Sequence, residues 1–130
     1  MNRDELVYRK DTKKEFETLI ADIEKEVDAH QFRVLGKHDI QATLAEKGMQ
    51  IPPYTIVEVC NGKFAHGVLT KEKEIGMMLP CRIAVYTDGD SNAVVMMKPE
   101  VMSQLMPAAD LGDIPAEVER ILIDVIEQAA

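Results

Sequence analysis

A chain of 130 residues is long enough to form one domain with its own hydrophobic core, without disulfide bonds or a structural metal. With 46% hydrophobic and 29% charged residues, the composition excludes a disordered chain and is typical of a globular protein. The formal net charge of −8 repels phosphate backbones and anionic lipids, so we expect neither a nucleic-acid-binding nor a membrane-surface protein.

The sequence carries no membrane or export signal. The longest unbroken apolar run, Ala93–Met97, is far shorter than the ~20 residues that cross a bilayer. The first residues, Met1–Glu5, contain no apolar signal core. We therefore expect a cytoplasmic protein, in which Cys60 and Cys81 stay reduced.

The first third of the chain predicts strands that alternate with helices. Leu6–Lys10 is expected to be a strand, and Thr12 and Glu15 then have the spacing of a capping box. A helix follows whose apolar residues share one face, at Phe16, Leu19, Ile20, Ile23 and Val27.

The next segments continue this alternation. Phe32–Gly36 predicts a second strand. A short helix runs from an Asp39 cap to a stop at Gly48, with Ile40 and Leu44 expected to point inward.

The middle of the chain predicts the centre of the sheet. After the break at Pro52 and Pro53, Tyr54–Cys60 is a strand rich in β-branched residues, and Asn61 can cap a helix that follows it. The segment 74–80 is expected to be a loop. Cys81–Tyr86 and Ala93–Met97 predict a hairpin, because the polar segment between them contains an Asp-Gly turn.

The C-terminal part predicts a short Met-rich segment and then a long helix, at about residues 114–128. This helix opens near Asp113, with Pro115 in its first turn, and it has one apolar stripe. The elements together predict a single α+β domain over residues 1–130. It would be a two-layer sandwich of about five mainly antiparallel strands, two long helices and short helical segments.

Four segments in the middle of the chain resemble a known family: Phe32–Leu35, His38–Asp39 with Ala42 close behind, Cys60–Ala65 and Gly76–Cys81. They resemble the prokaryotic family catalogued as domain of unknown function 302, over roughly residues 5–100. The corner Leu79–Pro80–Cys81 and the turn at Asn61 are the most specific parts. The resemblance implies a fold similar to one repeat of the TATA-binding protein, commonly paired as a homodimer. It implies no activity, and fold alone does not make an acidic chain a DNA-binding protein.

The residues around the two cysteines are the main candidates for a thiol or binding site: Cys60, Asn61, Pro80 and Cys81. Cys60 directly precedes a predicted helix, whose N–H groups would lower a thiol pKa if the sulfur faced them. Burial is the other interpretation for both cysteines. The two sulfurs can meet only if their strands are antiparallel neighbours, and the sequence does not decide this.

His38, Asp39 and His66 are weaker candidates for a site. His38 and Asp39 fit a strand end and a helix cap, although a carboxylate beside an imidazole could also accept a proton. His66 is not at a recognised ligand spacing from Cys60, so we predict no metal site and no cofactor.

Eight methionines is a high number, and several of them cluster around the last predicted strands. Thioethers could fill the core, bind Cu(I), or line an adaptable apolar pocket or dimer surface. Common enzyme motifs are missing from the sequence. The first hypothesis is therefore a non-enzymatic homodimeric module that binds a partner or a small apolar ligand. The alternative is a thiol-dependent redox or metal-binding protein that uses Cys60 and Cys81.

Overall fold

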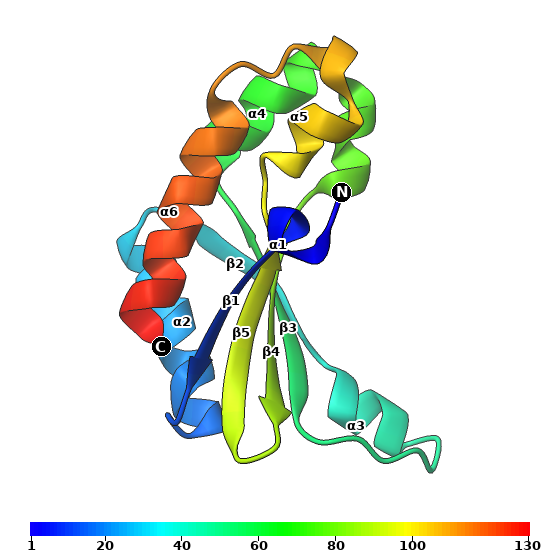
Figure 1. Ribbon diagram of the computed structural model, residues 1–130, viewed down its shortest axis with the longest axis vertical. Coiled ribbons are helices and arrows are strands. Elements are labelled where there is room, and N and C mark those ends of the chain that lie inside the picture. The colour runs from blue at the N-terminus through cyan, green and yellow to red at the C-terminus, as the bar shows by residue number, and fades with distance from the viewer.

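The computed structural model describes residues 1–130 and contains one antiparallel sheet of five strands, with the order β1-β5-β4-β3-β2 (Figure 1). Each strand pairs antiparallel with its neighbour. The strands are β1 (Val7–Thr12), β2 (Arg33–Asp39), β3 (Tyr54–Cys60), β4 (Cys81–Asp88) and β5 (Ser91–Met97). The predicted α+β class and the β4–β5 hairpin are confirmed.

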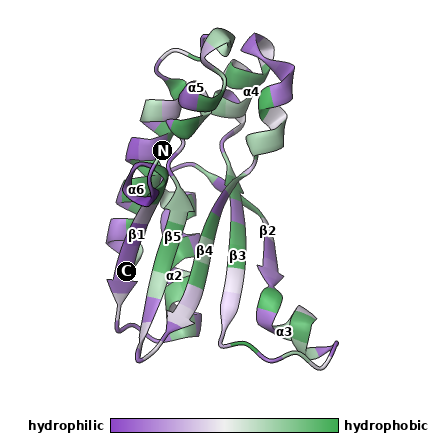
Figure 2. Cartoon of the chain, turned by 45° about the vertical axis from the view of Figure 1, so that its right-hand side comes forward, coloured by the Kyte–Doolittle hydropathy of each residue, from purple (hydrophilic) through white to green (hydrophobic).

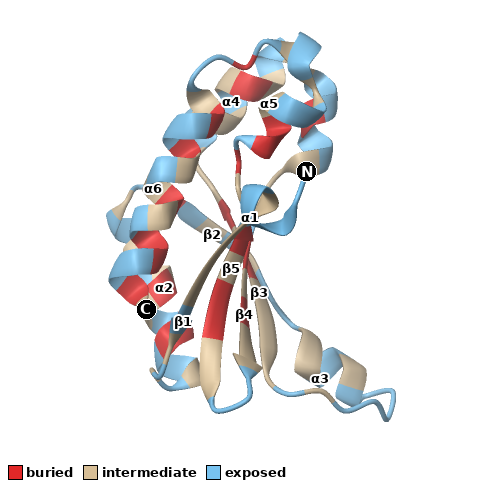
Figure 3. Cartoon of the chain, viewed as in Figure 1, coloured by how far each residue is buried: buried red, intermediate tan, exposed pale blue.

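Two long helices, α2 (Phe16–Ala29) and α6 (Ile114–Ala129), lie side by side and cover one face of the sheet (Figure 1). On each of these helices, the buried residues lie on the side that faces the other helix and the strands (Figure 3). Leu19, Ile23 and Leu122 have no exposed surface, and they pack with the valines of the central strands in one cluster of 16 buried residues. This cluster is the core predicted from the two apolar stripes.

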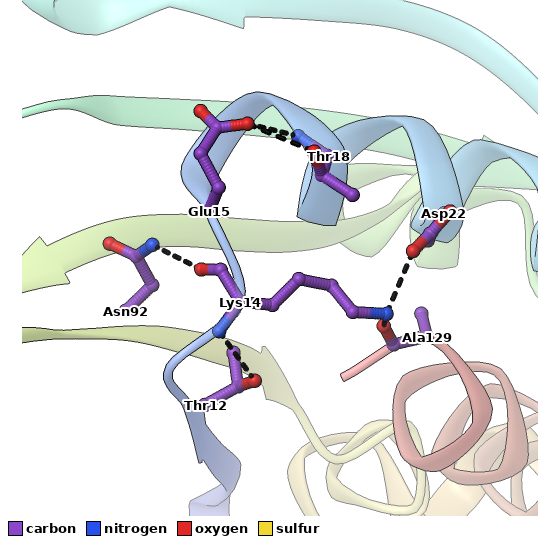
Figure 4. Close-up of polar contacts among 7 residues, drawn as sticks. All are labelled: Thr12, Lys14, Glu15, Thr18, Asp22, Asn92 and Ala129. Carbon is purple, nitrogen blue, oxygen red and sulfur yellow. Dashed lines mark hydrogen bonds and ion pairs between the residues drawn. The ribbon is translucent and has the colours of Figure 1, made fainter.

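The start of α2 differs from the predicted capping box. Thr12 ends β1, and its hydroxyl accepts a hydrogen bond from the backbone N–H of Lys14. Glu15 is the capping residue instead, since its carboxylate accepts from the N–H group of Thr18 (Figure 4) and from that of Glu17. The carboxylate at the helix N-terminus also complements the helix dipole, which explains why a glutamate can replace the predicted threonine.

Four short helical elements form a cluster at one end of the sheet, which we call the end cluster: α4 (Gly62–Lys71), η1 (Lys73–Met78), α5 (Val101–Leu105) and η2 (Pro107–Ala109). They enclose a smaller core of four buried residues, Val68, Ile75, Met102 and Leu111. The predicted loop at 74–80 is therefore wrong for its first part, because residues 73–78 form a 3-10 helix around the buried Ile75. A single buried side chain does not produce a periodic pattern that sequence analysis detects.

The helix α3 (Ile40–Ala45) extends away from the other elements, beyond the ends of β2 and β3 (Figure 1). It contains no buried residue, so the expectation that Ile40 and Leu44 point into the core is wrong. The N-terminal helix α1 (Arg3–Leu6) was not predicted, and the first strand begins one residue later than predicted and extends to Thr12.

Lys14 connects three parts of the fold at the end of β1. Its Nζ lies 2.7 Å from Oδ2 of Asp22 on α2 and donates to the carbonyl oxygen of Ala129 on α6 at 2.6 Å (Figure 4). Its own carbonyl accepts from the amide of Asn92 on β5. These bonds connect the middle of α2 and the C-terminal end of α6 to the sheet. None of the helices is both long and apolar enough to span a bilayer.

Candidate functional site

The two faces of the sheet have different environments. Side chains alternate along each strand, so Val57 and Val59 of β3 face the long helices and are fully buried. Ile56 of β3 and Ala84 of β4 are paired in the register and point to the opposite face. Figure 2 views the sheet from this second side, with α2 behind the strands and no long helix in front of them. We call this uncovered side the open face.

A groove of about 400 Å³ lies on the open face, where the strands meet the end cluster of short helices. Ten of its thirteen lining residues are hydrophobic. Its floor includes Ile56, Ala84 and Val95, which lie side by side on β3, β4 and β5 in the strand register. The groove has the volume and the apolar lining that are typical of small-molecule sites.

Four methionines from three elements line the groove: Met78, Met96, Met97 and Met102. Met96 and Met102 are buried and also belong to the larger and the smaller core, whereas 44% of Met97 is exposed. At least one member of each methionine cluster in the sequence therefore reaches the groove, whereas Met77 and Met106 do not line it. Unbranched thioethers adapt their shape, so this wall can accommodate ligands of different shapes.

The only charged residue that lines the groove is Arg82 of β4, and 52% of its side chain is exposed. Its Nε lies 3.5 Å from Oε2 of Glu58, which is its register partner on β3. The other carboxylate oxygen of Glu58, Oε1, lies 2.9 Å from Nε2 of His38 on β2. Glu58 is thus shared between two basic side chains across three strands of the open face.

Two stacked tyrosines occupy the other end of the open face. The rings of Tyr54 and Tyr86 lie 5.3 Å apart and nearly parallel, and the Arg9 guanidinium lies 5.8 Å from the Tyr86 ring centroid. Arg9 also contacts Asp11 at 2.8 Å and Asp88 at 2.9 Å, so its charge is already compensated. At this end of the face, the Arg9 guanidinium therefore already has two carboxylate partners.

Cys60 and Cys81 come together at one end of the sheet, because β3 and β4 are antiparallel neighbours and Cys81 pairs with Val59. Both are half-buried free thiols, and together with Phe32 and Phe64 they line a cavity of about 20 Å³. A space of this size holds one water molecule and no larger ligand.

The surroundings of both thiols disfavour the thiolate. Burial raises the pKa of Cys60, and the N–H of Asn61 offsets this only in part. Burial, followed by the neighbouring Cys60, raises the pKa of Cys81 to about 11. The thiol-dependent alternative is therefore not favoured, because a redox or catalytic cysteine requires an accessible thiolate.

Asn61 and Pro80 lie beside the cysteines and have structural positions. The Asn61 side chain accepts from the N–H of Phe64 at 3.1 Å, as predicted for the cap of α4. Its amide also donates to the carbonyl of Gln31 at 3.0 Å, which connects α4 to the turn before β2. Pro80 follows a cis peptide bond and lines the groove.

The weaker candidates do not form one site. Asp39 caps α3 by accepting from the N–H of Ala42, as predicted. His38 contacts Glu58 instead of Asp39, and His66 is exposed on α4. No group of three or more His, Cys, Asp or Glu side chains is placed to hold a metal ion.

The open-face residues were not identified from the sequence. Tyr54, Ile56 and Glu58 alternate with the buried positions of β3, and Arg82, Ala84 and Tyr86 do the same on β4. This alternation carried a signal: apolar residues on both faces of a central strand indicate that the second face is also partly protected from water. Because both faces contain apolar residues, the pattern alone does not show which face a helix covers.

Comparisons with known proteins agree with this architecture. The chain is similar to an uncharacterized conserved protein DUF302 from Bacillus stearothermophilus, whose crystal structure aligns with a TM-score of 0.90. The two sequences are 28% identical, and the alignment covers 95% of this chain and 98% of that one. No curated protein matches. The model of the family described as "Domain of unknown function DUF302" matches residues 8–129, and the chain therefore belongs to that family.

Proposed function

We propose that this protein is a small non-catalytic binding module, and that the open face of its sheet receives the ligand. The observation that supports the proposal is the groove of about 400 Å³ over Ile56, Ala84 and Val95. An uncovered apolar groove of this size is unfavourable in water, and it is retained in proteins mainly where something binds.

The chemistry of the groove favours binding over catalysis. General acid-base or nucleophilic catalysis requires a group whose pKa is adjusted to its task. The only thiol that lines the groove is Cys81, and its raised pKa keeps it protonated at neutral pH. Arg82, the only charged lining residue, offers hydrogen-bond donors and no acceptor, so it can bind or orient an anion but cannot serve as a general base.

The two edges of the sheet are poorly suited to a partner strand. The outer strand β1 carries the consecutive charged residues Arg9, Lys10 and Asp11. The other outer strand, β2, has a register shift between Val34 and Gly36. Charges and bulges on edge strands oppose pairing with another chain. We therefore assign binding to the face of the sheet and not to its edges.

We also propose that the chain is a homodimer, as the family resemblance implies. Light scattering of the purified protein measures this directly, and the expected result is twice the chain mass. A monomer at all accessible concentrations would contradict the dimer. This result leaves the groove proposal unaffected, because the groove is formed by one chain.

Binding in the groove can be tested with Nile red, an uncharged apolar dye whose fluorescence increases in an apolar site. We expect saturable binding to the wild type and loss of binding in Ala84→Phe, which fills the floor of the groove. The control is Ala21→Phe, at an exposed position of α2. The proposed function would be contradicted if the wild type showed no saturable binding of Nile red. It would also be contradicted if Ala84→Phe bound the dye with the same affinity as Ala21→Phe.

A further inference from the structure

Arg82 has unused capacity to bind an anion, and this points to the chemical class of the ligand. The guanidinium makes no hydrogen bond within the chain, and its one ionic contact runs from Nε to Glu58 at 3.5 Å. The terminal nitrogens therefore keep their hydrogen-bond donors available. By contrast, the other arginine of the open face, Arg9, bonds to Asp11, Tyr86 and Asp88.

Glu58 cannot compensate Arg82 fully, because it also contacts His38. The distance from Oε1 of Glu58 to Nε2 of His38, 2.9 Å, is that of a hydrogen bond, whereas the distance to Arg82 is longer. The Glu58 side chain is 20% exposed and that of Arg82 is 52% exposed. The His38 side chain is similarly exposed, at 53%, but it does not line the groove, so Arg82 is the member of this row that a ligand in the groove can reach.

The rest of the groove lining is predominantly apolar, and the negative charge of the protein is concentrated elsewhere. The segment 110–130 contains six acids and one base, and its helix α6 covers the opposite face of the sheet. At the groove, a guanidinium is therefore adjacent to a wall of methionines and to Ile56 and Val95. A guanidinium binds a carboxylate with two parallel hydrogen bonds, and such pairing strengthens where apolar surfaces exclude water.

We propose that the groove binds an elongated apolar molecule that ends in a carboxylate, with the chain along the methionine wall and the carboxylate on Arg82. This inference rests on the proposed function, because it assigns a ligand class to the same groove. The adaptable methionine side chains would tolerate apolar chains of different lengths, while Arg82 would select the charged end group.

The test compares decanoate with decanol, which differ only in the end group, as competitors for Nile red below their aggregation concentrations. We expect decanoate to bind the wild type about tenfold more tightly than decanol, since a charge-assisted pair contributes about that factor. Arg82→Gln should lower the affinity for decanoate by a similar factor and leave decanol unchanged. Arg82→Lys should lie between the two, because it keeps the charge without the paired donors.

Arg120→Gln is the matched control, because Arg120 is an exposed arginine on α6 that pairs with Glu117, away from the groove. It should change neither affinity. Equal affinities of the wild type for decanoate and decanol would overturn the assignment of Arg82 and leave the groove as an apolar site. If Nile red itself shows no saturable binding, the proposed function fails. The comparison of the two ligands on the wild type needs no variant, so a variant that does not fold leaves the inference testable.

Discussion

His30, at the end of α2, and Asp124 on α6 lie 94 positions apart in the sequence, and 2.7 Å separates Nε2 of His30 from Oδ2 of Asp124. The other ring nitrogen lies 2.7 Å from the carbonyl oxygen of Glu26. Both neighbours are acceptors, so the protonated imidazolium satisfies both contacts. The bond to Asp124, followed by the bond to Glu26, raises the pKa of His30, and His30 in turn lowers the pKa of Asp124.

This pair predicts a pH window for the stability of the two-helix layer. Because the pKa of His30 is raised in the folded protein, protonation of His30 stabilises the fold. This stabilisation is fully present at pH values below the ordinary histidine pKa of about 6.5, and it is lost as the pH rises through the folded-state pKa. The lowered pKa of Asp124 acts at the acidic end: its contribution is present above the ordinary value of about 4 and is lost as the pH falls through the folded-state pKa.

Thermal denaturation of the wild type and His30→Gln measures this effect. The wild type should have the higher Tm at about pH 5.5, and the difference should shrink at about pH 9. A difference of the same size at both pH values would show that the histidine contributes packing alone.

The thiols should react slowly in the native protein. With the pKa of Cys81 near 11, roughly one molecule in ten thousand carries the thiolate at neutral pH. Alkylation by iodoacetamide should therefore be slower for Cys81 than for Cys60, and both rates should increase with pH and on denaturation. The variants Cys60→Ala and Cys81→Ala assign each rate. A native thiol that reacts at neutral pH as fast as in denatured protein would restore the thiol-dependent alternative.

Asn61 should contribute to stability through two separable bonds. Asn61→Ala removes both the helix cap and the bond to Gln31, and should lower the free energy of unfolding by about 1–2 kcal/mol. Asn61→Asp keeps the acceptor for the N–H of Phe64 and removes only the donor, so the loss should be smaller. Urea denaturation measures both variants, and an aspartate variant that is less stable than the alanine variant would contradict this assignment.

The packing of α6 on the sheet can be tested at Leu122, which has no exposed surface. Leu122→Ala should lower the free energy of unfolding by about 2–5 kcal/mol, because it removes apolar contacts and leaves a cavity. Lys25→Ala, at an exposed position of α2, is the control and should change it by less than about 0.5 kcal/mol. Similar values for the two variants would be inconsistent with a core between the helices and the sheet.

Much of the fold could be predicted from the sequence because the two long helices have strong periodic patterns. The stripes around Leu19 and Leu122 predicted the helices and the core that they share. The caps Asn61 and Asp39 were predicted because short polar side chains before a helix have a specific local role. Local signals of this kind do not require knowledge of the tertiary structure.

The site could be predicted only in part. Cys60 and Cys81 could be singled out by their thiols, and the structure leaves both half-buried. Pro80 and Cys81 line the groove, whereas Cys60 lines the neighbouring small cavity. Arg82 and Ala84 were missed because their importance comes from the strand order, which joins residues far apart in the sequence. The contact of His38 with Glu58 was missed for the same reason: it depends on the β2–β3 register.

Amide chemical-shift mapping by NMR during a titration with decanoate shows whether the open face of the sheet is the binding surface. The shifts should concentrate in β3, β4 and β5 around Ile56, Ala84 and Val95, with little change at the exposed positions of α2 and α6. Shifts confined to the helical layer, or no shift at saturating decanoate, would contradict binding at the open face.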